Sequence, residues 1–448
     1  MNWGILILFI AIVLFGVLAF RGISALILAP LVTCFVLIFS PIFAGQDIAI
    51  LDGLKTQFMP AAADYVSSYF LVFFVGAIFG AVYQFTGAAK SIAKWLAGMC
   101  HGKFVAPIIM CITGLLTYGG ISGFVVFFVI YPIALQMFRS ANLTRRLIPA
   151  AISAGCWTWS MYGPGSPSIQ NVIPIEILGT TPTAALVPSL IATVASFVMI
   201  FVWLEYRARS FSKRGYYFHD DRMRTQLSPD ELQEDDPNES LPNPIVALIP
   251  IVVILVLFNV PIFNGAGLPV ETSVFAGVVL AVILFFPRIE GGITGWVKVF
   301  NKGAADSGVS ILNTAIVVGF GGVVQNTQGF TDLVASLQKL EMNPLIFVMI
   351  TVAVCAGACG SASGGMGVAF NALKDVYASL GANFEYVHRI GAIAAGTLDT
   401  LPHQGAQITL LGICKCTHKE AYFDIAITQI AIPFITCFIF IALASMSL

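Results

Sequence analysis

Asp399 is the side chain with the clearest chemical potential in this sequence. It lies in the segment 396–402, whose other residues are small or apolar apart from two threonines. An ionised carboxylate is costly to bury in such a segment, so Asp399 is a candidate for binding a proton or a cation. The alternative is a helix cap that satisfies the amides freed before Pro402. His403 is either a partner that titrates in the physiological range or an ordinary loop histidine.

Two glycine- and serine-rich segments, 118–123 and 360–365, interrupt long apolar stretches. A helix that begins after such an interruption has free amides, and its dipole favours an anion at that end. The serine hydroxyls can add hydrogen bonds, so we expect both segments to contact a carboxylate. The alternative is that small residues serve only close packing of helices.

Two more helices are expected to break at proline, in the segments 162–167 and 401–405. The first break is followed by neutral polar residues: Ser166, Ser168, Gln170 and Asn171. These side chains can bind hydroxyl or carboxylate oxygens or coordinate sodium, or they can form an ordinary external loop. Trp157 and Trp159 precede the break and favour a small, mostly apolar substrate, unless both rings face lipid or a neighbouring helix.

The composition identifies the surroundings of these segments. Apolar residues make up 58% of the 448 residues, charged residues only 10%, and the mean hydropathy is +0.90. A soluble domain carries about 25% charged residues, so we expect an all-α polytopic membrane protein whose partner is the lipid bilayer. A net charge of −1 gives no basic face for nucleic acid. The N-terminus lacks the basic region of a cleaved signal peptide.

Apolar runs of about 20 residues predict about ten spanning helices. They cover residues 3–20, 23–43, 65–86, 147–163, 184–204, 244–262, 270–286, 308–327, 387–401 and 421–446. The stretches 104–138 and 344–372 are expected to be re-entrant helical hairpins that do not cross. The arm 104–117 would be only about 21 Å long as a helix, which is shorter than a hydrocarbon core of about 30 Å.

Lysine and arginine predict the orientation, because cytoplasmic loops are enriched in both. Placing Arg21 in the cytoplasm puts most of the other basic residues on the same side. The basic residues left outside are Lys55, Lys339, Lys374 and Arg389. Both termini are then expected to face outward.

The two halves of the chain resemble each other. The segment 120–123 aligns with 361–364, and Arg146 aligns with Arg389 at nearly the same offset, each before a helix with a proline break. In the expected orientation this repeat is inverted, which is typical of secondary transporters. We expect scaffold helices in 1–64 and 244–307, a first repeat in 65–204 with an inner hairpin (104–138), a cytoplasmic linker in 205–243, and a second repeat in 308–448 with an outer hairpin (344–372). The linker is either flexible or a regulatory segment.

The motifs in these repeats are similar to those of the gluconate permease family of the ion transporter superfamily. They are Gly87-Ala88-Ala89, Tyr118-Gly119-Gly120 and Gly163-Pro164-Gly165-Ser166-Pro167 in the first half, and Gly360-Ser361-Ala362-Ser363 and Thr397-Leu398-Asp399-Thr400-Leu401-Pro402-His403 in the second. The sequence most resembles members for short hydroxy acids such as 3-hydroxybutyrate. The resemblance implies proton-coupled uptake by a homodimer with a fixed scaffold and a moving transport domain. Residues 156–160 depart from the polar stretch of sugar-acid permeases, which implies a smaller substrate.

We therefore expect a symporter in the cell membrane that takes up a small organic monocarboxylate with protons, by an elevator-type mechanism and without a cofactor or metal. A sodium-coupled or sugar-acid transporter is the alternative. A channel or a membrane-embedded enzyme is disfavoured, because the sequence lacks a nucleophile–base constellation. The expected substrate contacts are Gly120, Ser122, Gly123, Trp157, Ser166, Ser361, Ser363, Gly364, Thr400 and His403, and the expected coupling-ion residues are Asp399 and His403.

Overall fold

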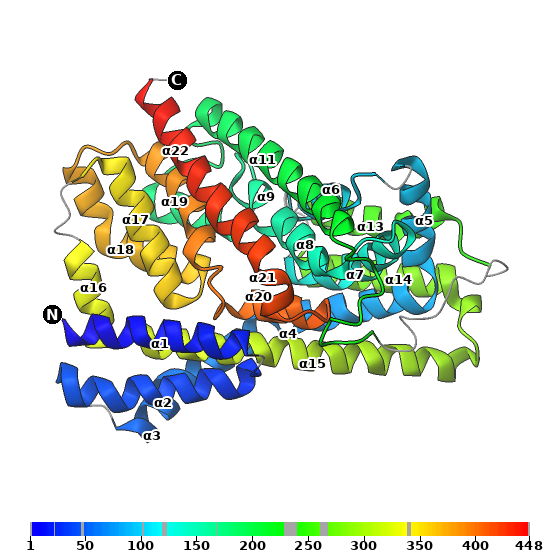
Figure 1. Cartoon of the computed structure of the whole chain (residues 1–448), viewed down its shortest axis with the longest axis horizontal. Helices are drawn as coiled ribbons and strands as arrows, with labels where there is room; N and C mark the ends of the chain where they lie inside the picture. Colours follow the sequence, from blue (N-terminus) through cyan, green and yellow to red (C-terminus); the bar gives the residue numbers. More distant parts are fainter. Residues whose placement is uncertain are drawn as a thin grey trace.

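A computed structural model describes residues 2–21, 23–45, 49–100, 103–118, 123–166, 168–227, 240–259, 268–337 and 342–446. All regular secondary structure in these ranges is helical, so the predicted all-helical membrane fold is confirmed (Figure 1). Within them, seven helical segments are long and apolar enough to cross a bilayer: Trp3–Phe20, Ala25–Ala44, Ile50–Phe85, Leu186–Lys213, Glu271–Arg288, Gly292–Gln325 and His418–Ser445.

The helices follow the same order in both halves. The N-terminal half contains α1 (Trp3–Phe20), α2 (Ala25–Ala44), α3 (Ile50–Gly53), a π-helical turn (Leu54–Phe58), α4 (Met59–Phe85), α5 (Ala88–Cys100), α6 (Val105–Tyr118), α7 (Gly123–Ser140), α8 (Ile148–Trp157), α9 (Trp159–Tyr162), α10 (Ile169–Leu178) and α11 (Leu186–Lys213). The C-terminal half contains α13 (Pro244–Asn259), α14 (Val270–Phe285), α15 (Gly292–Gln325), α16 (Gln328–Leu337), α17 (Pro344–Cys359), α18 (Ala362–Ser379), α19 (Phe384–Leu398), α20 (Gly405–Ile413), α21 (His418–Ala426), a π-helical turn (Ile427–Ala431) and α22 (Ile432–Ser445).

Two of the ten predicted spans are too short to cross a bilayer as single helices. The span 147–163 contains α8, which has 10 residues, and the span 387–401 contains α19, which has 15. These helices are about 15 and 22 Å long, against a core of about 30 Å. The reason is local unwinding: α8 stops at Thr158, where φ is −123° and ψ is −115°, and α19 stops at Asp399.

The helices α4 and α15 lie side by side along the molecule (Figure 1). Gly303 of α15 approaches Ile78 of α4, whereas Gly319, four turns later, approaches Phe58 at the other end. The two helices are therefore antiparallel. Figure 1 places α1, α2 and α16 at one end of this pair and α5, α13 and α14 at the other.

Each hairpin is built from two closely packed helices. The arm α6 has 14 residues, and α17 has 16. In the second hairpin Gly360 turns the chain with a φ of +61°, and Ser361 caps α18 by accepting a hydrogen bond from the Gly364 amide (3.2 Å). A Cβ atom on Gly365 would lie 2.2 Å from the Cα of Ala356, so the arms approach at backbone distance. Residues 119–122 of the first hairpin lie outside the described ranges.

Part of the expected linker, 205–243, is built into the fold instead. The helix α11 continues to Lys213, so the first basic residues are helical. The loop 214–227 then packs on the helices and buries Phe218, Met223 and Leu227. These apolar side chains explain why the loop is not a solvated linker. The acidic run at 230–239 lies outside the described residues.

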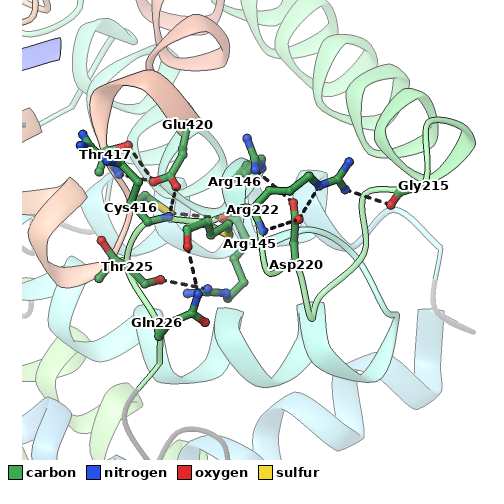
Figure 2. A network of polar contacts seen from close by, with 12 residues as sticks. Arg145, Arg146, Gly215, Asp220, Arg222, Thr225, Gln226, Cys416, Thr417 and Glu420 are labelled. Carbon is green, nitrogen blue, oxygen red and sulfur yellow. Dashed lines mark hydrogen bonds and ion pairs between the residues drawn. The ribbon is translucent and has the colours of Figure 1, made fainter. Parts of the chain in front are cut away.

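Asp220 holds this loop in place (Figure 2). Its carboxylate accepts hydrogen bonds from Arg146 (3.1 Å) and Arg222 (2.6 Å), and the nearby Arg224 amide donates to Glu420 (2.7 Å). The loop thus joins the start of α8 to the start of α21. Burial raises the pKa of Asp220, but the hydrogen bonds from Arg222 and the charges of Arg146 and Arg222 outweigh it and hold that pKa below its ordinary value.

The contact between α4 and α15 predicts a difference between two glycines of α15. A Cβ on Gly303 would lie 2.8 Å from the Cα of Ile78, whereas one on Gly308 would meet nothing within 4 Å. We expect Gly303→Ala to lower stability by about 1–3 kcal/mol through overpacking. Gly308→Ala should be neutral or stabilising, because alanine has the higher helix propensity. Thermal unfolding in detergent measures both, and equal midpoints would contradict the packing described.

The Asp220 network predicts a local loosening. We expect Asp220→Asn to speed amide hydrogen exchange several-fold in the loop 214–227, while the exposed neighbour Asp221 gives a silent control as Asp221→Asn. Because the pKa of Asp220 is lowered by folding, its contribution is present above about pH 4 and is lost as the pH falls below that value. Exchange in the wild type, corrected for the intrinsic rate, should therefore match at pH 5 and pH 8. Unchanged exchange in Asp220→Asn would refute the anchoring role.

Candidate functional site

A cavity of about 370 Å³ lies where the helix breaks and hairpin ends converge. One wall is formed by α4 and α15, through Tyr65, Tyr69, Thr314 and Val318. The rest comes from the hairpins, the broken helices and the π-helical turn of residues 427–431: Thr117, Gly123, Phe124, Cys156, Trp157, Met161, Ser168, Ile169, Gln170, Gly360, Ser361, Ala362, Ser363, Gly396, Asp399, Thr400, Gln404, Gly405, Ala406 and Gln429. Segments from both halves therefore share one site.

The N-terminal end of α18 faces this cavity. Ser361, Ala362 and Ser363 line it, while Gly364 lies behind them and donates its amide to the Ser361 hydroxyl. A helix of 18 residues presents its positive end here, which favours an anion. The segment can therefore bind a carboxylate with backbone amides and the Ser363 hydroxyl.

Asp399 lies on the same side of the cavity, directly after α19. It is 5% exposed, and it accepts hydrogen bonds from Thr400 Oγ1 and Gln404 Nε2, each at 3.2 Å. Its partners are neutral, and within the described ranges it forms no ion pair. Gln404, rather than Asp399, caps α20, because Gln404 Oε1 accepts from the Gln407 amide (2.8 Å). Asp399 also lies near the Ala362 amide, so ion binding and capping of α18 both stay open.

His403 is fully buried instead of lying at a loop surface. Its ring packs against Phe15 and Phe320, and its Nε2 donates to the carbonyl of Gly357 (2.9 Å) near the end of α17. Its Nδ1 has no hydrogen-bond partner within the described structure. His403 thus supports the second hairpin from behind and does not line the cavity.

The two tryptophans of the first break point to different places. Trp157 lines the cavity and packs edge-on against Phe127 with ring centroids 4.7 Å apart. Trp159 packs over Gly114, where a Cβ would lie 2.0 Å from the indole, and against Phe197. Only one of the two indoles therefore reduces the cavity volume.

Asn171 satisfies the carbonyls that the first break releases. Its Nδ2 donates to the carbonyls of Met161 (3.0 Å), Gly163 (3.3 Å) and Ser166 (3.1 Å). Ser166 is buried behind the wall, and its hydroxyl accepts from the Ser168 amide (3.3 Å). The external-loop interpretation of this segment is therefore wrong for Asn171, which is fully buried.

Gln429 is a lining residue that the sequence interpretation missed. It lies in the π-helical turn Ile427–Ala431, a feature frequent at functional sites. Its Oε1 accepts from Gln407 (2.7 Å), and its Nε2 donates to Ser153 (2.6 Å). A glutamine inside the apolar run 421–446 was the available signal. Tyr65, Tyr69, Thr314 and Gln404 were missed as well.

The predicted site residues fall into three groups. Those that line the cavity are Gly123, Trp157, Ser361, Ser363, Asp399 and Thr400. Those that support the wall from behind are Ser166, Gly364 and His403. Gly120 and Ser122 lie outside the described residues. Their roles in binding stay predictions.

The apolar spans and the shared internal cavity define an α-helical integral membrane protein. The chain matches no family model. It is 31% identical over 464 residues to the uncharacterized transporter YxjC of Bacillus subtilis (strain 168), an alignment that covers 95% of this chain and 96% of that protein. The chain belongs to the family of that transporter and is a membrane transporter. The gluconate permease resemblance, the particular membrane and the orientation stay predictions.

Proposed function

We propose that the protein is a secondary symporter that takes up a small organic monocarboxylate together with protons. The observation that carries this proposal is the single cavity that contains both an anion-favouring helix end, Ser361–Ser363, and a buried carboxylate, Asp399. The first suits the substrate and the second suits a coupling ion. The family of a named transporter supports transport rather than catalysis.

The size and lining of the cavity favour a short substrate. Its volume of about 370 Å³ is near the lower end of the range of about 300–1,000 Å³ for ligand sites. Phe124, Trp157 and Val318 give it apolar surface, which leaves the hydroxyls of a sugar acid without partners. A monocarboxylate with at most one hydroxyl, such as 3-hydroxybutyrate, meets both conditions.

The two walls suggest how access alternates. In this proposal α4 and α15 are the fixed part, and the hairpins and broken helices move along them as an elevator. The resemblance-based homodimer belongs to the same proposal. Sodium coupling is the second candidate, because Asp399, Thr400, Gln404 and Gln429 bring several oxygen atoms into the cavity, and oxygen ligands suit a hard cation.

Purified protein in proteoliposomes tests the function. We expect 3-hydroxybutyrate to accumulate when a pH gradient, acid outside, is imposed without sodium, and unlabelled 3-hydroxybutyrate to inhibit more strongly than gluconate. Accumulation only with a sodium gradient would replace the proton by sodium. Stronger inhibition by gluconate would overturn the small-substrate assignment, and uptake with neither gradient would overturn the symporter.

Asp399 separates coupling from binding. We expect Asp399→Asn to abolish accumulation against a gradient while it retains counterflow exchange of substrate, because exchange needs no net proton movement. Asp375→Asn, an exposed change on α18, is the matched control and should accumulate normally. If Asp399→Asn still concentrates substrate, Asp399 is a helix cap and the coupling group lies elsewhere.

A further inference from the structure

Arg389 is a buried charge with neutral partners. It lies in the second turn of α19, and its side chain is 0% exposed. Its guanidinium donates to Ser189 Oγ (2.9 Å), Asn171 Oδ1 (2.8 Å) and the carbonyls of Tyr162, Pro182 and Ala184. Within the described part of the chain no carboxylate lies within ion-pair distance of it. A guanidinium keeps its proton in proteins, so a full positive charge remains uncompensated here.

The acid nearest in sequence does not neutralise this charge. Glu385, one turn earlier on α19, is exposed to solvent and accepts a hydrogen bond from the Ala185 amide (3.1 Å). A solvated carboxylate is strongly screened. The neighbouring His388 accepts or donates only neutral hydrogen bonds, with Thr180 (2.7 Å) and Asn171 (3.2 Å).

One side chain separates Arg389 from the cavity. Asn171 Oδ1 accepts from Arg389, which fixes the amide so that Nδ2 points to the carbonyl of Met161. Met161 and the adjacent Gln170 line the cavity. Arg389 thus orients the wall of the first break and places a positive charge directly behind it.

The other titratable side chains around the cavity add no charge at neutral pH. Tyr65, Tyr69 and Cys156 line it, and Tyr422 donates to the carbonyl of Thr400 (3.1 Å); phenols and thiols are neutral under these conditions. His403 donates through Nε2 and has no partner for a proton on Nδ1. Asp399 and Arg389 are therefore the charged pair that determines the balance of the site.

Resting on the proposed function, we infer that Arg389 is the fixed counter-charge of the substrate and that it makes each translocating form neutral. In the empty form ionised Asp399 balances Arg389. In the loaded form one proton neutralises Asp399, and one substrate carboxylate balances Arg389. The stoichiometry is then one proton per monocarboxylate, and neither form carries charge across the membrane. A dicarboxylate or an uncharged amide breaks this balance.

Counterflow exchange tests this charge balance, because only the loaded form crosses. In proteoliposomes with the voltage set by potassium and valinomycin, we expect 3-hydroxybutyrate exchange by the wild type and by Arg389→Lys to be independent of voltage. Arg389→Gln leaves the loaded form with one negative charge, so its exchange should become voltage-dependent and its KM should rise about tenfold or more. Arg214→Gln, at an exposed position, should match the wild type.

Three results overturn the inference: voltage-dependent exchange by the wild type, voltage-independent exchange by Arg389→Gln, or a KM unchanged by that substitution. If Arg389→Gln does not fold, competition on the wild type decides instead. There we expect 3-hydroxybutyramide and malate to compete at least about tenfold more weakly than 3-hydroxybutyrate, and equal competition by the amide rejects the counter-charge. A wild type that transports no carboxylate refutes the proposed function itself and is thereby a different outcome.

Discussion

The fold depends on one constraint: inside a bilayer, each backbone amide and carbonyl freed by a helix break must find a partner in the protein. Here those partners come from other segments. Asn171 accepts the burden of three carbonyls in the first break, and His403 of the second break donates to Gly357 in the second hairpin. Breaks that satisfy one another must pack together. That requirement brings four interruptions, far apart in sequence, around a single cavity.

Local composition was sufficient to locate these interruptions. Glycine, proline and serine mark the loss of helix wherever they occur, so the second tip at Gly360 and the break after Asp399 were both predictable. Helix lengths were less so. The helix α15 begins at Gly292, well before the predicted 308, because its polar start pairs Lys302 with Asp306 along the helix and packs Gly303 on α4.

Side-chain direction was beyond the sequence, because unwinding destroys the period on which such predictions rest. Trp157 and Trp159 flank Thr158, whose backbone is not helical, so their rings diverge. Long-range partners were equally invisible. Arg389 is placed at an outer helix end by sequence, yet it is buried by Asn171 and Ser189, about 200 residues earlier in the chain. Gln429 enters the cavity through a π-helical turn that the apolar pattern does not reveal.

The two walls of the cavity differ in chemistry, and this difference favours movement along one of them. The α4–α15 wall contributes two tyrosines, a threonine and a valine, whereas Asp399 and Arg389 belong to the opposite side. Polar contacts of α15 with α20 include Thr314–Thr409 (2.6 Å) and Thr409–Ser310 (3.2 Å), and neutral hydrogen bonds contribute only about 0.5–1.5 kcal/mol each. Separating buried charges from the dipoles that solvate them costs several kcal/mol per ion. Sliding along α4 and α15 breaks the weaker set and keeps the charges, their solvating dipoles and a bound carboxylate together.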